Sequence, residues 1–336
     1  MDQRQIIPTR DRLQLMKLLL LLLLNLHLYA SDVLTNYRVH GIINMEKQMD
    51  LELSQEEYWK TQVAQRDTTF GYIESFSNVL ACDKTQSALH LYSLDQNKTF
   101  QFRKKYSAFT GKLKGDKVKE GDLRTPTGIY QIVEKLSKET KLDPFYGPFA
   151  FVTSYPNVYD TYRGKNGSGI WIHGLPQQDR DEFTRGCIAI NNSSIECLSN
   201  NIDISKTLLI IDESEIKKNI AKETLVSILA QLYAWRYAWI YDDIKSYLNF
   251  YASEFVRFDG MDREKFASYK TRIFQKGERK TIIFNDINVI PYPNSSDIYE
   301  ISFKEFYKSD TFEFTGEKTL VVALDENRKI KILTEK

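Results

Sequence analysis

Short alternating segments between about residues 76 and 212 indicate a β-rich domain. Each segment either alternates apolar and polar residues or is rich in β-branched residues, and turn residues separate one from the next. The segments read ALHLYSL, GIYQIV, FAFVTSY, SGIWIHG, CIAI and TLLIID. We expect each of them to form a strand.

Two of these predicted strands carry chemically reactive side chains. Because successive side chains of a strand point to opposite faces, one set is expected in the core: Ile170, Ile172, Ile188 and Ile190. The other set takes the opposite face: Trp171, His173, Cys187 and Ala189. If the two strands are neighbours, the histidine and the cysteine share the face opposite the core.

The regions on either side of this domain have helical patterns. Residues 44–66 lack Gly and Pro and space Met45, Met49, Leu53 and Tyr58 at roughly helical intervals, which predicts a small helical region. Such a region buries little by itself, so we expect it to pack on the next domain or on a second copy. Residues 223–255 predict one or two amphipathic helices, and further alternating segments follow. We predict a mixed α+β protein, with an N-terminal helical region at 31–75, a β-rich domain at 76–212 and an α+β domain at 213–336.

The first residues have the pattern of a targeting segment. Three basic residues, Arg10, Arg12 and Lys17, precede the leucine run Leu18–Leu24. This order predicts a secretory signal peptide over residues 1–30 and a mature chain outside the cytoplasm, in the periplasm. A retained anchor and a buried helix are the alternatives, although the apolar run is short for a membrane span.

Composition excludes one class of partner and raises a question about the thiols. The 46 Lys and Arg nearly balance the 45 Asp and Glu, so no global field favours nucleic acid. The three cysteines, Cys82, Cys187 and Cys197, show no CxxC spacing, and an odd number leaves at least one free. In an oxidising compartment a free thiol is either buried or has a chemical function. We expect Cys82 and Cys197 to be core residues.

His173 and Cys187 form a candidate catalytic pair. An imidazole near a thiol can act as its base, and the amides of Gly186 and Cys187 can face a developing oxyanion. A buried histidine beside a structural cysteine is the alternative. Zinc is a weaker alternative, because His173, Cys187 and Cys197 lack ligand spacing and a fourth partner. We predict neither a metal nor a cofactor.

Three ordered motifs support the catalytic interpretation. GDLRTPTGIY (121–130), GKNGSGIWIHG (164–174) and TRGCIAI (184–190) together resemble the YkuD-type L,D-transpeptidase catalytic domain. The resemblance implies a β-sandwich-like fold, with Cys187 as nucleophile, His173 as base and the backbone carbonyl of Gly174 orienting the imidazole. It also implies oxyanion donors at Gly186 and Cys187, and a peptidoglycan stem peptide that loses its terminal D-alanine to leave a thioester on Cys187.

The candidate substrate-binding residues are Arg185, Trp171 and Thr184. Many transpeptidases of the family have His where this chain has Arg185, and Arg or Asn where it has Ala189. Without those groups a second stem-peptide amine is held less well, so water takes the acyl group. Arg185 pairs with a substrate carboxylate in one interpretation and is a solvated surface residue in the other.

The C-terminal segment resembles an NTF2-like domain with a cone-shaped pocket. Trp235 and Trp239 lie at i and i+4 on one helical face, where they are either core or pocket lining, and Tyr241 and Asp242 are further pocket candidates. The order of segments resembles periplasmic LD-carboxypeptidases that set cell shape in curved and helical Gram-negative rods. We therefore expect a cysteine-dependent LD-carboxypeptidase that trims tetrapeptide stems to tripeptides. The alternatives are an L,D-transpeptidase and an inactive wall-binding scaffold. Expected partners are the stem peptide, a glycan or peptide ligand in the NTF2-like pocket, and a second copy bound through the N-terminal region.

Overall fold

The computed structural model describes residues 33–176, 183–214 and 219–336. Ser54–Lys336 form one compact unit, and the residues before Ser54 form a separate one. Residues 33–53 are helical. The predicted signal peptide lies outside the described residues. Within them, no helix has both the length and the apolar character to cross a membrane.

Helix α2 (Glu56–Ala64) confirms helical structure in the predicted N-terminal region, but with a different buried face. The helix pattern is interrupted at Ser54 and Gln55, which changes its phase. Consequently Tyr58 is exposed while Trp59 is buried. Trp59 packs against Tyr233 of the C-terminal domain, with ring centroids 5.1 Å apart.

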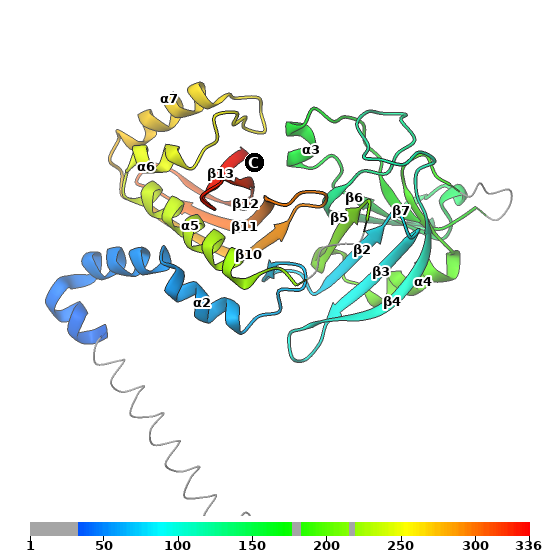
Figure 1. Cartoon of the computed structure of the whole chain (residues 1–336), viewed down its shortest axis with the longest axis horizontal. Coiled ribbons are helices and arrows are strands. Elements are labelled where there is room, and N and C mark those ends of the chain that lie inside the picture. Colours follow the sequence, from blue (N-terminus) through cyan, green and yellow to red (C-terminus); the bar gives the residue numbers. More distant parts are fainter. Residues whose placement is uncertain (1–32, 177–182, 215–218) are drawn as a thin grey trace, which may run out of the picture. The chain divides into compact units, whose positions relative to one another are not determined.

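Eight strands form a closed barrel in the order β2-β3-β4-β8-β7-β6-β5-β9. The strands are β2 (Asn78–Asp83), β3 (Ala88–Leu94), β4 (Phe100–Phe109), β5 (Gly128–Ser137), β6 (Phe149–Thr153), β7 (Trp171–His173), β8 (Ile188–Ile190) and β9 (Thr207–Asp212). All six predicted segments contain a strand. The implied sandwich-like arrangement differs in that one continuous barrel forms instead of two sheets (Figure 1).

Short helices connect the barrel strands. They are α3 (Val158–Tyr162), α4 (Asn192–Asn201) and the 3-10 helices η1 (Lys138–Thr140), η2 (Pro144–Tyr146) and η3 (Ile204–Lys206). The barrel core contains the four predicted isoleucines, Ile170, Ile172, Ile188 and Ile190, together with Ile195 and Leu198 of α4. The alternation read from the sequence is therefore confirmed for β7 and β8.

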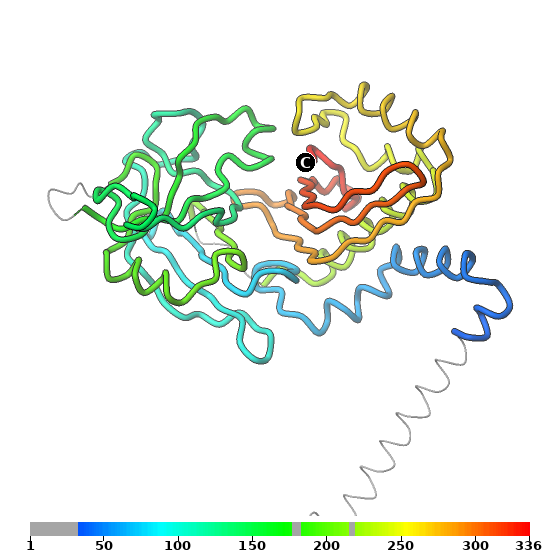
Figure 2. The backbone as a smooth tube through the Cα atoms, turned by 180° about the vertical axis from the view of Figure 1, so that it is seen from behind, coloured from blue at the N-terminus to red at the C-terminus, as the bar shows by residue number. Residues whose placement is uncertain are grey.

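The C-terminal domain combines three helices with a curved sheet (Figures 1 and 2). The helices are α5 (Lys222–Ile240), α6 (Ile244–Asn249) and α7 (Arg263–Phe274). The sheet has the order β1-β10-β11-β12-β13 and consists of β1 (Tyr72–Ile73), β10 (Thr281–Pro291), β11 (Ile298–Lys308), β12 (Glu313–Leu324) and β13 (Ile330–Glu335). Strand β1 precedes the barrel in sequence but pairs with β10, so a segment before the barrel completes this sheet.

Other elements of the compact unit pack against most sides of helix α5. Apolar residues therefore occupy most of its positions. Trp235 is fully buried and stacks on Phe284 of β10 and on Tyr247 of α6. Tyr233 contacts Trp59 of α2. The core interpretation of Trp235 is therefore confirmed.

The barrel and the C-terminal sheet share a hydrophobic cluster. From the barrel come Val79, Ala81, Ile129, Leu208 and Ile210, and from the C-terminal domain come Ile290, Tyr292, Val321 and Leu333. The outer face of β2 and β9 thus packs on the sheet. Separating the two domains would expose this apolar surface to water.

Candidate active site

A cavity of about 480 Å³ lies beside the C-terminal end of β7 and the start of β8. It is lined by His173, Cys187 and Ala189 from the predicted outward face, by Thr184 and Arg185, and by apolar or aromatic residues, namely Phe109, Phe145, Tyr146, Leu175, Pro176 and Phe183. The structure therefore brings the predicted nucleophile and base into one cavity.

The pairing of β7 with β8 creates this proximity. The strands are parallel, with Ile172 opposite Ile188 and His173 opposite Ala189. Cys187 immediately precedes β8, so its side chain lies on the same face as those of His173 and Ala189.

The His173 ring is held in one tautomer. Its Nδ1 lies 2.5 Å from the Gly174 carbonyl oxygen. Because a carbonyl oxygen only accepts, Nδ1 carries the proton and Nε2 keeps a free lone pair. Burial lowers the pKa of His173, and the bond to Gly174 only partly opposes this shift. The imidazole is therefore neutral at pH 7 and able to accept a proton.

The Cys187 thiol is also neutral in this state. Burial raises its pKa, while the Trp171 backbone amide and the Lys117 charge act in the opposite direction. The thiol donates to the Gly169 carbonyl oxygen at 3.4 Å. Since the thiol has a single proton, it must turn away from Gly169 before His173 can accept that proton.

The turn before Cys187 is fixed by Thr184. Its hydroxyl donates to the Cys187 carbonyl oxygen at 2.6 Å and accepts from the Gly186 amide at 3.0 Å. Gly186 has a φ of 138°, which favours glycine. The Gly186 amide, a predicted oxyanion donor, is thus engaged by Thr184 in this state. Its catalytic role stays a prediction.

Asn192 holds the segment that follows His173, and sequence reasoning missed it. Its amide group accepts from the Leu175 amide at 2.7 Å and donates to the Leu175 carbonyl at 3.0 Å. A Cβ on Gly174 would lie 2.5 Å from Asn192 Oδ1, so only glycine fits there. The polar pair Asn191-Asn192 directly after an apolar strand was the available signal.

Tyr146 was also missed by the sequence analysis. Its ring packs edge-on against the His173 ring, with the two ring centroids 5.1 Å apart. The Trp171 side chain is partly exposed, and its ring centroid lies 4.9 Å from that of Tyr146. Trp171 does not line the cavity, whereas Thr184 and the exposed Arg185 do. Substrate contacts of these three predicted residues stay predictions.

The other two cysteines differ in environment. Cys82 is buried, and burial raises its pKa to about 12. Cys197 is only partly buried, with the Lys104 ammonium 3.3 Å from its sulfur, so its assignment to the core was wrong. It projects from α4 beside Ile195 and Leu198, which do fill the core. All three cysteines are free.

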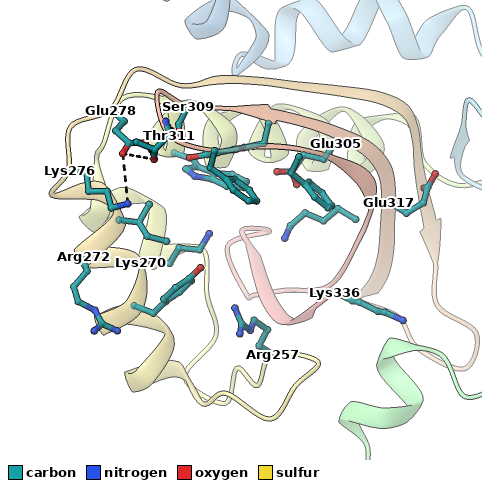
Figure 3. Close-up of a pocket in the computed structure, with 17 residues that line it drawn as sticks. Arg257, Lys270, Arg272, Lys276, Glu278, Glu305, Ser309, Thr311, Glu317 and Lys336 are labelled. Carbon is teal, nitrogen blue, oxygen red and sulfur yellow. Dashed lines mark hydrogen bonds and ion pairs between the residues drawn. The ribbon is translucent and has the colours of Figure 1, made fainter.

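A second cavity, of about 840 Å³, opens in the C-terminal domain (Figure 3). Its basic lining residues are Arg257, Lys270, Arg272, Lys276, Lys318 and Lys336, and its acidic ones are Glu278, Glu305 and Glu317. Lys270 and Glu305 reach the cavity from α7 and β11. Positive charge predominates in this lining.

The buried cation of the second cavity rests on an aromatic ring. Lys270 Nζ lies 4.4 Å from the centre of the Trp239 ring, and burial lowers the Lys270 pKa to about 8. Of the predicted pocket residues, Trp239 lines the cavity, but Trp235, Tyr241 and Asp242 do not. Asp242 instead pairs with Lys280 at 2.5 Å.

Comparison with known families assigns both domains. Residues 77–212 match the L,D-transpeptidase catalytic domain YkuD, and residues 227–336 match the Cds6 C-terminal NTF2-like domain. The solved structure of the helical cell shape determining protein Pgp2 from Campylobacter jejuni is 39% identical, with 84% of this chain and 99% of Pgp2 covered and a TM-score of 0.76. The chain belongs to the Pgp2 family. It is a peptidoglycan-active enzyme of the L,D-transpeptidase superfamily.

Further comparisons agree with this family. A mutant structure of Pgp2 matches at 39% identity, covering 85% of this chain and 99% of Pgp2, with a TM-score of 0.78. Bd1075 from Bdellovibrio bacteriovorus is 26% identical, with 81% of this chain and 96% of Bd1075 covered and a TM-score of 0.61. No curated protein sequence matches the chain.

The two pKa directions predict how Cys187 alkylation depends on pH. Since the Cys187 pKa is raised and that of His173 is lowered, the resting pair is uncharged at neutral pH. The rate of Cys187 alkylation by iodoacetamide should rise continuously up to and beyond pH 9, as measured by peptide mass spectrometry. Cys82 serves as the buried internal control. A rate plateau between about pH 6 and 8 would instead show a preformed thiolate and imidazolium pair.

Proposed function

We propose that this Pgp2-family enzyme is a periplasmic LD-carboxypeptidase that removes the terminal D-alanine from tetrapeptide stems. The observation that carries the proposal is the shared cavity of Cys187 and His173, in which the bond from His173 Nδ1 to Gly174 leaves Nε2 with a free lone pair. Pgp2 is a helical cell shape determining protein, and this similarity supports an effect of the present chain on cell shape as well.

The reaction begins with a neutral thiol. His173 Nε2 takes the thiol proton as the sulfur attacks the carbonyl of the third stem residue. The Cys187 amide, and the Gly186 amide once it leaves Thr184, stabilise the oxyanion. The imidazolium then protonates the departing D-alanine amine, and a thioester remains on Cys187. Water, deprotonated by His173, attacks the thioester and breaks its C–S bond, which releases the tripeptide, and the imidazolium returns the proton to the Cys187 sulfur.

The acceptor side favours water over a second peptide. Ala189 lies in the cavity lining and offers no polar group, and the exposed Arg185 would repel a protonated amine. Transfer to another stem, which would make the protein an L,D-transpeptidase, is the alternative. An intact nucleophile and base disfavour a purely structural scaffold.

We expect the Cys187→Ala and His173→Ala proteins to lose D-alanine release from disaccharide-tetrapeptide. Removing a member of a single catalytic unit lowers kcat by about a thousandfold or more. Mass analysis of the muropeptide digest, with excess acceptor peptide present, should show mainly tripeptide from the unaltered enzyme and none from the Cys187→Ala protein. Abundant 3–3 linked dimers would establish the transpeptidase instead, and full activity of Cys187→Ala would refute Cys187 as the nucleophile.

The cationic cavity of the NTF2-like domain is our candidate for a second wall-binding site. Its basic excess suits the carboxylates of stem peptides, and Trp239 borders the cavity beside Lys270. Deleting this domain would test the idea poorly, because the shared core would be exposed. A point change in the cavity avoids that problem.

The Lys270→Gln protein should bind intact sacculi several-fold more weakly and yet turn over a small soluble muropeptide at the normal rate. The reason is that Lys270 lies in the second cavity and outside the catalytic one. Lys265→Gln is the matched control, since Lys265 lies on the same helix but is exposed. Pull-down with sacculi measures the effect. Equal binding by both variants and the parent protein would refute a wall-binding cavity.

Residues 33–53 are our candidate for contact with a second copy. This helical stretch exposes several large apolar side chains: Val33, Leu34, Tyr37, Val39, Ile42, Ile43, Met49 and Leu51. Burying such side chains in a dimer would remove them from water. Sedimentation of the mature chain should show a dimer, and a chain that begins at Ser54 should be monomeric. A monomeric mature chain would contradict this assignment.

A further inference from the structure

The loop between β4 and β5 contains a buried ion pair outside both cavities. Lys117 Nζ lies 3.0 Å from Asp122 Oδ1, and their side chains are 5% and 3% exposed. Asp122 belongs to the segment 121–130, the first of the three motifs that resemble the L,D-transpeptidase family. The carboxylate nevertheless points inward, so it serves the protein and not the substrate directly.

Asp122 gathers the loop around its carboxylate. Oδ2 accepts from the amides of Val118 and Lys119 at 2.8 and 3.1 Å, and Oδ1 accepts from the Arg124 amide at 3.2 Å and from Lys117. Although burial opposes ionisation, these bonds hold the Asp122 pKa well below its usual range. The loop therefore closes around a permanent negative charge.

One side of this loop supports the segment whose carbonyl accepts a hydrogen bond from the Cys187 thiol. The Val118 carbonyl accepts from the Asn166 amide at 3.1 Å, and Asn166 Oδ1 accepts from the Glu120 amide at 2.9 Å. Three residues after Asn166, the Gly169 carbonyl accepts from the Cys187 thiol. The position of that acceptor thus depends on the Asp122 loop.

The other side of the loop abuts the turn that carries the nucleophile. The Arg124 carbonyl oxygen lies 2.8 Å from where a Cβ on Gly186 would be. The next residue, Thr125, accepts from the Gly111 amide at 2.8 Å, and Gly111 forms a bridge to Thr184. Movement of the loop would therefore shift the residues on either side of Arg185.

Lys117 adds a charge to this arrangement. Its ammonium lowers the Cys187 pKa, in opposition to the larger effect of burial. Asp122 and the Lys119 carbonyl oxygen, at 3.0 Å each, hold that ammonium in place.

We propose that Asp122 is a positioning residue for catalysis, which fixes the Gly169 acceptor, the Gly186 turn and the Lys117 ammonium around Cys187. This inference rests on the proposed role of Cys187 as nucleophile. It assigns the segment 121–130 a structural task in the catalytic site, because the Asp122 carboxylate holds the loop that contacts the turn before Cys187.

The test compares three variants by Cys187 alkylation and by D-alanine release. Asp122→Asn keeps the side-chain shape but replaces two acceptor interactions with a donor amide, so kcat should fall about ten- to a hundredfold with KM little changed. Lys117→Met keeps the backbone bonds to Asp122, and its pH profile of Cys187 alkylation should move to higher pH. Asp95→Asn is the matched control, since Asp95 gathers the β3–β4 turn through the Asn97 and Thr99 amides.

The readouts separate this inference from the proposed reaction. Cys187 alkylation needs no substrate, so it tests the Asp122 arrangement even if the protein releases no D-alanine. Slower alkylation in Asp122→Asn together with an unchanged rate in Asp95→Asn supports the proposal. Unchanged alkylation and kcat in a folded Asp122→Asn protein, with only a lower Tm, would overturn it. If Asp122→Asn fails to fold, Lys117→Met decides, and an unshifted alkylation profile there rejects the proposal.

Discussion

Two three-residue strands, β7 and β8, pair in parallel, and the chemistry of the protein depends on that pairing. A parallel pair aligns side chains of the same parity on one face, so His173 comes opposite Ala189 and next to Cys187. The residues of the opposite parity are isoleucines, and their side chains fill the barrel core. A slip of one residue in either strand would exchange the two sets, placing a thiol or imidazole in the core and an isoleucine in the cavity. The apolar core therefore holds the register of the catalytic pair.

Backbone groups and an amide side chain then fix the orientation of the residues that the strands bring together. The Gly174 carbonyl selects the His173 tautomer, and Asn192 fixes the chain after it at a point where only glycine fits. Around the thiol, burial dominates the electrostatics and keeps the resting pair uncharged. Such a site suits a mechanism in which proton transfer accompanies attack, because no thiolate is stored beforehand.

The association of the two domains has a separate physical basis. The outer face of β2 and β9 is apolar and packs on the C-terminal sheet, while β1 adds an edge strand to that sheet from a segment before the barrel. Polar contacts reinforce the contact, including the Asn157 side chain, which donates to the Tyr292 hydroxyl at 3.0 Å. The NTF2-like domain and the catalytic domain thus share one hydrophobic core. The cationic cavity belongs to the same compact unit as the catalytic site.

The sequence by itself determined six of the eight barrel strands, the faces of β7 and β8, and the choice of Cys187 and His173 as the candidate pair, because period-two alternation and short motifs are local properties. It placed Cys197 in the core wrongly, since helical spacing alone does not say how deeply a side chain at the edge of a buried face lies. It did not show that Asn192 binds Leu175, that the Asp122 carboxylate organises its own loop, or that Trp239 rather than Trp235 borders the second cavity. Those relations join residues from separate segments. Only the tertiary structure decided them, because burial, pKa and hydrogen-bond partners depend on which segments the closed barrel and the curved sheet bring into contact.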